Sequence, residues 1–238
     1  MDILFFISGF VAEVVGTVAG FGSSTIFLPL ALLFFDFRTS LVLVAFMHIF
    51  GNLGRISFFR HGLDRKLLWS FGLPSVISTF IGALFASYLP QTVLKGILGV
   101  FLVGYALVSL IENFRLNADR KNIALGGATS GFLAGLIGTG GALRGAFLTA
   151  FQLKKEKYIA TAAAIAIAVD LTRIPVYVSQ GFLEQPYYWY IPVLFIVALT
   201  GSYIGKQIVD IIPQKIFRNV VLLGLVLVGV KFVFDWLS

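Results

Sequence analysis

The sequence contains no cysteine, and charged residues make up only 12% of its 238 positions. The absence of cysteine excludes disulfides, thiolate metal sites and cysteine nucleophiles. No paired carboxylates, metal-ligand cluster, nucleotide-binding loop or nucleophilic triad occurs at a spacing that supports catalysis. We therefore expect a protein that is not an enzyme and that needs no metal or cofactor.

Hydrophobic residues make up 58% of the chain, and the mean hydropathy is +0.96. A soluble domain of this length needs more polar surface, so an integral membrane protein is expected. The apolar runs are long enough to cross a bilayer as helices, and the ten-residue alternation of a membrane barrel is absent. No signal peptide is recognisable at the start, so we expect the first helix to remain in the mature protein.

The formal net charge is +7, and the isoelectric point is about 9.7. In a membrane protein, Lys and Arg in cytoplasmic loops explain such an excess better than nucleic-acid binding does. Membrane lipids are therefore expected partners and nucleic acid is not, while a homodimer stays open.

The second half of the sequence repeats the first. Glycine-rich stretches with the same internal spacing begin both halves, at 9–17 and 131–139. Rare residues then recur in the same order: Asn52-Leu53-Gly54-Arg55-Ile56 with Asp170-Leu171-Thr172-Arg173-Ile174, Trp69 with Trp189, and Pro90-Gln91 with Pro213-Gln214. Such matches indicate a duplication, with a first repeat at 1–112 and a second at 113–238.

Each repeat is predicted to contain a glycine-broken hairpin, at 3–35 (arms 3–18 and 20–35) and at 122–153 (arms 122–138 and 141–153), followed by three long helices. These helices are expected at 40–60, 67–88 and 91–112, then at 158–180, 187–211 and 213–236. If each break turns the chain, most Lys and Arg lie on one face, and the positive-inside rule then puts both termini outside the cytoplasm.

The expected fold class is an all-α polytopic membrane protein with an inverted repeat of 5+5 helical segments, because an odd number of segments per half reverses the second half. A hairpin arm of 16 residues is only about 24 Å long, while the hydrocarbon core is about 30 Å thick. Whether the arms cross the membrane or are re-entrant therefore stays open.

The two hairpin tips, GTVAGFGSS at 16–24 and GTGGALRG at 138–145, form the candidate binding site. A turn at membrane depth leaves backbone N–H groups unpaired, and glycine lets an anion approach them. The alternative is that small residues only allow close helix packing. The candidate residues are Gly16, Thr17, Gly20, Gly22 and Ser23 at the first tip, and Gly138, Thr139, Gly140, Gly141 and Arg144 at the second.

Arg144 directly follows the second tip and has no basic counterpart in the first hairpin. A charge in the centre of a membrane costs at least about 2.5 to 3.5 kcal/mol, so each such group needs a partner or a wet cavity. Arg144 is therefore our first choice for direct contact with an anion.

Arg55 and Arg173 lie three residues after Asn52 and Asp170, on the same helix faces. Two interpretations stay open for these four residues, namely anion binding and an internal hydrogen bond or ion pair.

Glu13 and His48 are candidates for proton coupling. The alternative for Glu13 is neutralisation of an arginine, and the alternative for His48 is an ordinary packing role.

The paired stretches GFVAEVVGTVAGFGSSTIFLPLALL and GFLAGLIGTGGALRGAFL resemble the TauE/SafE family of sulfite and organosulfonate exporters, along essentially the whole chain. The resemblance implies a permease of the bacterial or archaeal inner membrane that moves small sulfur-containing anions, typically outward. Family members usually have a Gly-Gly-Gly run and a proline after each tip. Here the first tip reads Val18-Ala19-Gly20, and Thr149 stands where the second proline would be.

The expected function is thus export of a small sulfur oxyanion, such as sulfite or an organosulfonate like sulfoacetate, by alternating access around a midplane site between the tips. The alternatives are a transporter of another small anion such as a carboxylate, a proton-coupled importer, a lipid-phosphate translocase, and a membrane assembly factor that transports nothing.

Overall fold

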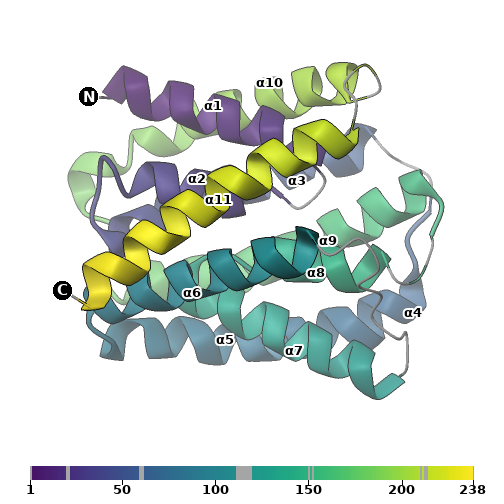
Figure 1. Ribbon diagram of the computed structural model, residues 1–238, viewed down its shortest axis with the longest axis horizontal. Coiled ribbons are helices and arrows are strands. Elements are labelled where there is room, and N and C mark those ends of the chain that lie inside the picture. Colours follow the sequence, from purple (N-terminus) through teal and green to yellow (C-terminus); the bar gives the residue numbers. More distant parts are fainter. Residues whose placement is uncertain are drawn as a thin grey trace.

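The computed structural model describes residues 2–19, 22–58, 62–110, 120–149, 151, 153–209, 211 and 214–237, and the regular elements in this part are all helices (Figure 1). The first half contains α1 (Asp2–Ala19), α2 (Ser24–Ala31), α3 (Phe37–Phe58), α4 (Arg65–Leu67), the π-helix η1 (Leu68–Gly72), α5 (Leu73–Tyr88) and α6 (Gln91–Leu110). The second half contains α7 (Arg120–Ile137), α8 (Gly141–Thr149), α9 (Lys155–Ser179), the short 3-10 helix η2 (Gln185–Tyr187), α10 (Tyr190–Ile208) and α11 (Gln214–Leu237).

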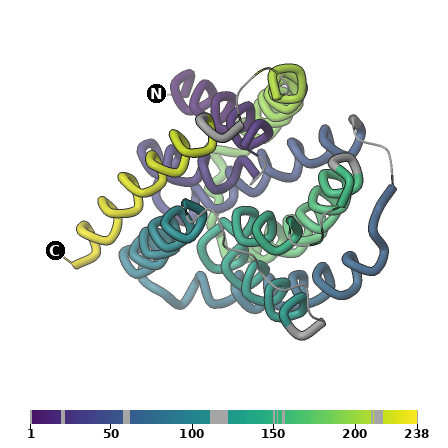
Figure 2. Tube along the Cα trace, turned by 45° about the vertical axis from the view of Figure 1, so that its right-hand side comes forward, coloured from purple at the N-terminus to yellow at the C-terminus, as the bar shows by residue number. Residues whose placement is uncertain are grey.

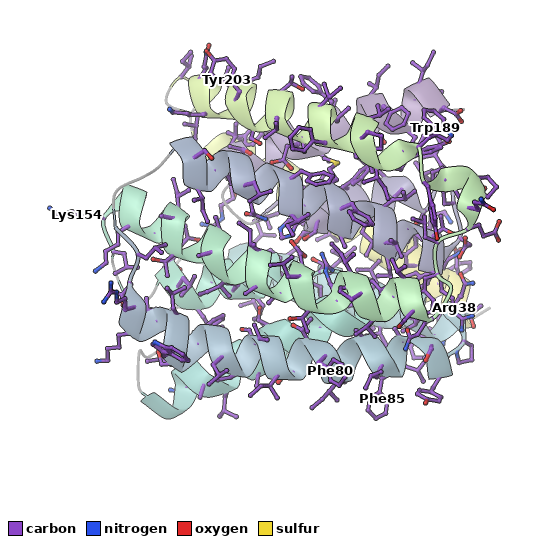
Figure 3. All side chains as sticks on the ribbon, turned by 180° about the vertical axis from the view of Figure 1, so that it is seen from behind. Arg38, Phe80, Phe85, Lys154, Trp189 and Tyr203 are labelled. Atoms are coloured by element: carbon purple, nitrogen blue, oxygen red, sulfur yellow. The ribbon has the colours of Figure 1, made fainter. Side chains whose placement is uncertain are left out.

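Within these described residues, 7 helical stretches are long and apolar enough to cross a membrane. They comprise α1, α3, α4 to α5, α6, α9, η2 to α10, and α11, and α7 adds a shorter apolar helix. Large apolar side chains such as Phe80 and Phe85 point away from the bundle, as expected for a lipid-facing surface (Figure 3). The prediction of an all-α multi-pass membrane protein is confirmed.

Both glycine breaks turn the chain, because α2 packs back on α1 and α8 packs back on α7. The predicted second arms, at 20–35 and 141–153, were too long. The helix α2 has 8 residues and α8 has 9, which correspond to about 12 Å and 14 Å. Neither can cross a hydrocarbon core of about 30 Å, so both are half-helices that start at the tips.

Other helix bounds also differ from the predicted ones. The helix α3 begins at Phe37 instead of at residue 40, because the Asp36 carboxylate accepts hydrogen bonds from the backbone N–H groups of Arg38 (2.9 Å) and Thr39 (3.3 Å). The helix α10 begins at Tyr190 instead of at residue 187, since the residues before it form η2.

The packing of the helices is symmetric between the two halves. The helix α1 packs on α10 as α7 packs on α5, and α3 packs on α10 as α9 packs on α5. The helices α3 and α9 contact each other, and so do α6 and α11, which lie side by side in Figures 1 and 2. The predicted repeats thus interlock, since the hairpin of each half packs on a helix of the other. The opposite membrane orientation of the two halves stays a prediction.

Close contact between α7 and α5 explains several glycines of α7. A side chain on Gly127, Gly131 or Gly135 would collide with the backbone of α5 or η1. Two hydroxyl groups of α5 use this proximity: Ser75 donates to the Gly127 carbonyl (2.8 Å) and Thr79 to the Gly131 carbonyl (3.0 Å). Small residues that admit such contacts are the usual basis of helix association in membranes.

Candidate anion-binding site

The two hairpin tips meet in the interior of the bundle. The hydroxyl groups of Thr25 and Thr139 share a hydrogen bond of 2.7 Å, and both residues are fully buried. The helix α2 starts at Ser24 and α8 starts at Gly141, so the N-terminal ends of both half-helices lie beside this contact. The first turn of a helix has backbone N–H groups without an intrahelical partner, and it carries a partial positive charge.

Ser23 adds a free hydroxyl group to the first tip. It stands in the capping position before α2, yet its side chain makes no capping hydrogen bond. Its Oγ is buried and has no hydrogen-bond partner in the described part of the chain. A buried hydroxyl group is normally paired, so this one is suited to a ligand.

The glycines of the tips serve different purposes. A side chain on Gly16 would overlap the backbone of the second arm, and one on Gly140 would overlap the Ser130 carbonyl of α7. Gly138 has a φ of +74° and faces the Leu41 side chain. At these three positions, tight packing within the fold accounts for the glycine.

Gly22 is different, because it faces a polar group, the ring of His48. Its φ of +85° lies in the left-handed region that favours glycine. A Cβ atom there would lie 3.3 Å from Nε2 of His48 and 4.0 Å from Cα of Gly141. Gly22 therefore lies where the first tip, the second tip and His48 converge.

Arg144 lies in the first turn of α8, and 5% of its surface is exposed. Its guanidinium group makes no hydrogen bond and no ion pair with the described residues, although Asp170, Tyr158, Arg173 and Arg55 are near enough to act on it electrostatically. A buried cation without a direct partner is costly, so this group is the strongest attraction for an anion at the tips.

Arg173 fastens α9 to the end of α7. Its Nε and Nη2 contact the Asp170 carboxylate at 2.9 Å and 2.7 Å, and its Nη1 donates to the carbonyls of Ala134 (2.9 Å) and Gly138 (2.8 Å). The side chains of both Arg173 and Asp170 are buried. This arginine thus holds the backbone that leads into the second tip.

Arg55 fastens α3 to the end of α1 in the same way. Its Nη2 donates to the carboxylate of Glu13 (2.6 Å) and to the hydroxyl of Thr17 (3.0 Å), while its Nη1 donates to Asn52 (3.1 Å). The internal ion pair that was one of the two interpretations is therefore present at both Arg55 and Arg173. Their contact with an anion stays a prediction.

His48 and Asp170 connect the two halves. The Nδ1 atom of His48 lies 2.8 Å from a carboxylate oxygen of Asp170, and both side chains are buried. The other ring nitrogen, Nε2, is buried and unpaired within the described residues. The backbone carbonyl of His48 accepts a hydrogen bond from Asn52 (2.7 Å).

The charges around the tips leave a surplus of one positive charge. The Glu13 carboxylate balances Arg55, and the Asp170 carboxylate balances Arg173. Arg144 has no such counterion in the described part, so with His48 neutral the site carries a net charge of about +1. A small anion would neutralise it.

Comparison with known proteins gives the family. The model of the family described as sulfite exporter TauE/SafE matches residues 5–232. The chain belongs to the TauE/SafE family. A probable membrane transporter protein of Methanocaldococcus jannaschii is 28% identical over 242 residues, which cover 90% of this chain and 86% of the relative. No solved structure matches the chain.

This TauE/SafE family protein is therefore a multi-pass membrane transporter. Its structure divides most of the predicted site residues into two groups. Gly22, Ser23, Thr139, Gly141, Arg144, His48, Asp170 and Arg173 surround the junction of the tips, whereas Gly16, Thr17, Glu13, Asn52 and Arg55 lie at the end of α1 and along α3. Gly138 and Gly140 belong to the backbone of the second tip, and Gly20 lies outside the described residues.

Tyr177 and Ser130 support the second tip but were not predicted. The Tyr177 hydroxyl donates to the carbonyls of Ala134 and Gly135, and the Ser130 hydroxyl donates to the Gly140 carbonyl (2.8 Å). Tyr177 follows Arg173 by one helical turn, so its place on the same helix face could have been recognised from spacing. No spacing pattern in the sequence points to Ser130.

Proposed function

We propose that the chain transports a small oxyanion that binds between the two hairpin tips. The observation that carries this proposal is Arg144, a buried guanidinium without a partner in the described part, in the first turn of α8, the half-helix that contacts α2. Helix N-termini, hydroxyl groups and a planar guanidinium group are the donors that a compact oxyanion accepts from. The surplus positive charge of the site fits a negative substrate.

A sulfur oxyanion, such as sulfite or a small organosulfonate like sulfoacetate, is the substrate class that the family description favours. Export needs no coupling ion, because an interior-negative potential of 100 mV favours outward movement by about 2.3 kcal/mol per negative charge. The described tip residues are enclosed, which favours a small anion over the head group of a lipid. A carboxylate and a lipid phosphate are the alternatives that binding measurements would reveal.

Different roles follow for the site residues. We assign direct contact to Arg144, to the backbone at Gly22 and Gly141, and to the hydroxyl groups of Ser23 and Thr139. The donors of Arg173 and Arg55 are already engaged, so these arginines would position the tips and change partners during alternating access.

Arg144→Gln is the test of this proposal. We expect it to weaken anion binding by about 2 to 3 kcal/mol, which is roughly 30- to 150-fold, because a charge-assisted contact is lost. Binding would be measured on purified protein with sulfite, sulfoacetate, sulfate, thiosulfate and a small carboxylate. Arg38→Gln is the matched control, because Arg38 lies at an end of the bundle, where it contacts the Phe182 ring and the Ser87 carbonyl. Unchanged affinity in a folded Arg144→Gln protein would place the anion elsewhere.

We further propose that the end of the bundle that carries Lys154 faces the cytoplasm. Lys154 and Arg38 lie at opposite ends of the bundle, and both chain termini lie at one end (Figures 1 and 3). Lys157 is at the Lys154 end, where it pairs with Asp64 (3.0 Å) next to Arg65 and Lys66. The positive-inside rule assigns this basic end to the cytoplasm and both termini to the outside.

Cysteine labelling tests the orientation, since the chain has no cysteine of its own. In intact cells, an impermeant maleimide should label Glu184→Cys, which is exposed in the loop between α9 and α10, and should leave Lys154→Cys unlabelled. Opening the cells should make Lys154→Cys reactive. Labelling of Lys154→Cys in intact cells would refute the proposed orientation.

A further inference from the structure

His48 directs an unpaired ring nitrogen at the junction of the tips. Nε2 lies 3.3 Å from the position that a Cβ on Gly22 would occupy, and that position is 4.0 Å from Cα of Gly141. The His48 side chain is buried, and Nε2 has no hydrogen-bond partner in the part of the chain that is described. Because a buried polar atom is normally paired, the geometry indicates that a partner of Nε2 enters with the substrate.

The other ring nitrogen fixes the role of Nε2. Asp170 is held as a carboxylate by Arg173 and can only accept a hydrogen bond, so Nδ1 of His48 carries the hydrogen of their 2.8 Å contact. In a neutral imidazole Nε2 is then an acceptor that would repel an anion. Once protonated, Nε2 becomes a donor aimed at the junction of the tips.

Several charged groups surround His48. Asp170 and Arg173 of α9 and Arg144 of α8 act on its ring directly, while Glu13 of α1 is paired with Arg55 on α3 itself. The helix α2 has no ionisable residue. The other ionisable residues on elements packed against α3 are not among the groups that act most strongly on the His48 ring: Asp2 on α1, Lys157, Tyr158 and Tyr177 on α9, Lys95 and Tyr105 on α6, and Tyr190, Tyr203 and Lys206 on α10.

Histidine is the side chain that ordinarily gains or loses a proton near neutral pH, so the protonation of His48 sets the charge of the site. With a neutral ring, the surplus charge of Arg144 matches an anion with one negative charge. With a protonated ring, the surplus is about +2, which matches an anion with two. An unbalanced charge costs much free energy in the low-dielectric interior. A doubly charged anion should therefore favour the protonated form of His48, and a singly charged anion the neutral form.

We infer that His48 is the proton-binding residue of this transporter, and that it takes up one proton through Nε2 when a doubly charged anion binds between the tips. A singly charged anion binds without this proton. Both kinds of substrate then cross the membrane with one net negative charge. The inference rests on the proposed anion site, and it adds the rule by which that site accepts anions of different charge.

Binding of two anions with fixed charge tests this inference. Sulfate carries two negative charges and methanesulfonate one, throughout the range from about pH 6 to pH 8 in which a histidine titrates. The full chain would be purified, and calorimetry in buffers of different ionisation enthalpy would give the number of protons taken up. For sulfate we expect uptake of about one proton and weakening of up to about tenfold per pH unit as the pH rises. For methanesulfonate we expect uptake near zero and a nearly constant affinity.

His48→Gln provides the second measurement. Glutamine can still donate a hydrogen bond to Asp170 but cannot be protonated, so proton uptake with sulfate should disappear. Size-exclusion chromatography would check that the variant is folded. If it is not folded, the comparison of the two anions in the unaltered chain decides the question by itself.

The outcomes separate this inference from the anion site on which it rests. Equal pH dependence for sulfate and methanesulfonate in the unaltered chain overturns the role of His48, and so does persistent proton uptake in a folded His48→Gln protein. If both anions bind and Arg144→Gln weakens them, the anion site survives either result. If neither of them binds, the inference about His48 fails, and if no anion of the panel tested with Arg144→Gln binds either, the anion site fails too.

Discussion

Arg173→Gln is expected to lower the free energy of unfolding by about 3 to 5 kcal/mol, because it leaves the buried Asp170 carboxylate without its ion-pair partner. It also removes the donor that serves the carbonyls of Ala134 and Gly138. Buried carbonyl groups without a donor add to the cost. The end of α7 and the second tip should therefore loosen first.

The measurement is the thermal midpoint of the purified protein in one detergent. Lys231→Gln is the matched control, because it breaks an ion pair with Asp235 on the exposed surface of α11. Exposed pairs at this helical spacing contribute only about 0.3 to 0.5 kcal/mol, so the control should barely change the midpoint. If Arg173→Gln lowers the midpoint no more than Lys231→Gln does, the buried pair does not hold the tip.

The helices and turns could be predicted wherever a short stretch of sequence determines them. The length of the apolar runs predicts the long helices, and the glycines at 16–22 and 138–141 predict the two turns. The spacing of Asp170 and Arg173 put them on one helix face, and they form an ion pair. The end of α2 was missed because residues 32–35 are as apolar as the helix itself. Phe35 leaves the helix to pack against Phe5, with ring centroids 4.9 Å apart, and this tertiary contact has no local signal.

The central contacts of the site were not predictable from spacing. His48 and Asp170 are separated by 122 residues, and Thr25 and Thr139 by 114. These pairs form because α3 packs on α9 and because the two tips meet where α2 contacts α8, and a sequence pattern within one repeat cannot reveal such contacts between the halves. Glu13 meets Arg55 within the first half, where α1 packs on α3, and this pairing was one of the two interpretations of Glu13.

Gly22→Val is expected to abolish transport while the protein still folds. The new side chain would start 3.3 Å from Nε2 of His48 and fill the junction at which both tips converge. Valine also strains the backbone at a φ of +85°, by about 1 to 2 kcal/mol for a residue with a Cβ in the left-handed region. Two effects are therefore mixed in this variant, namely loss of the anion's space and loss of stability.

Gly181→Val separates the two effects. Gly181 has a φ of +73°, so valine meets a similar backbone strain there, but a Cβ would have no atom of the described residues within 4 Å. Both variants should lose a similar amount of thermal stability, and only Gly22→Val should lose uptake of labelled sulfite into inside-out vesicles. Normal uptake by a folded Gly22→Val protein would mean that the first tip is a packing element. Because the side-chain donors of the site would remain in that protein, the anion would then have to reach them by a route that avoids the junction of the tips.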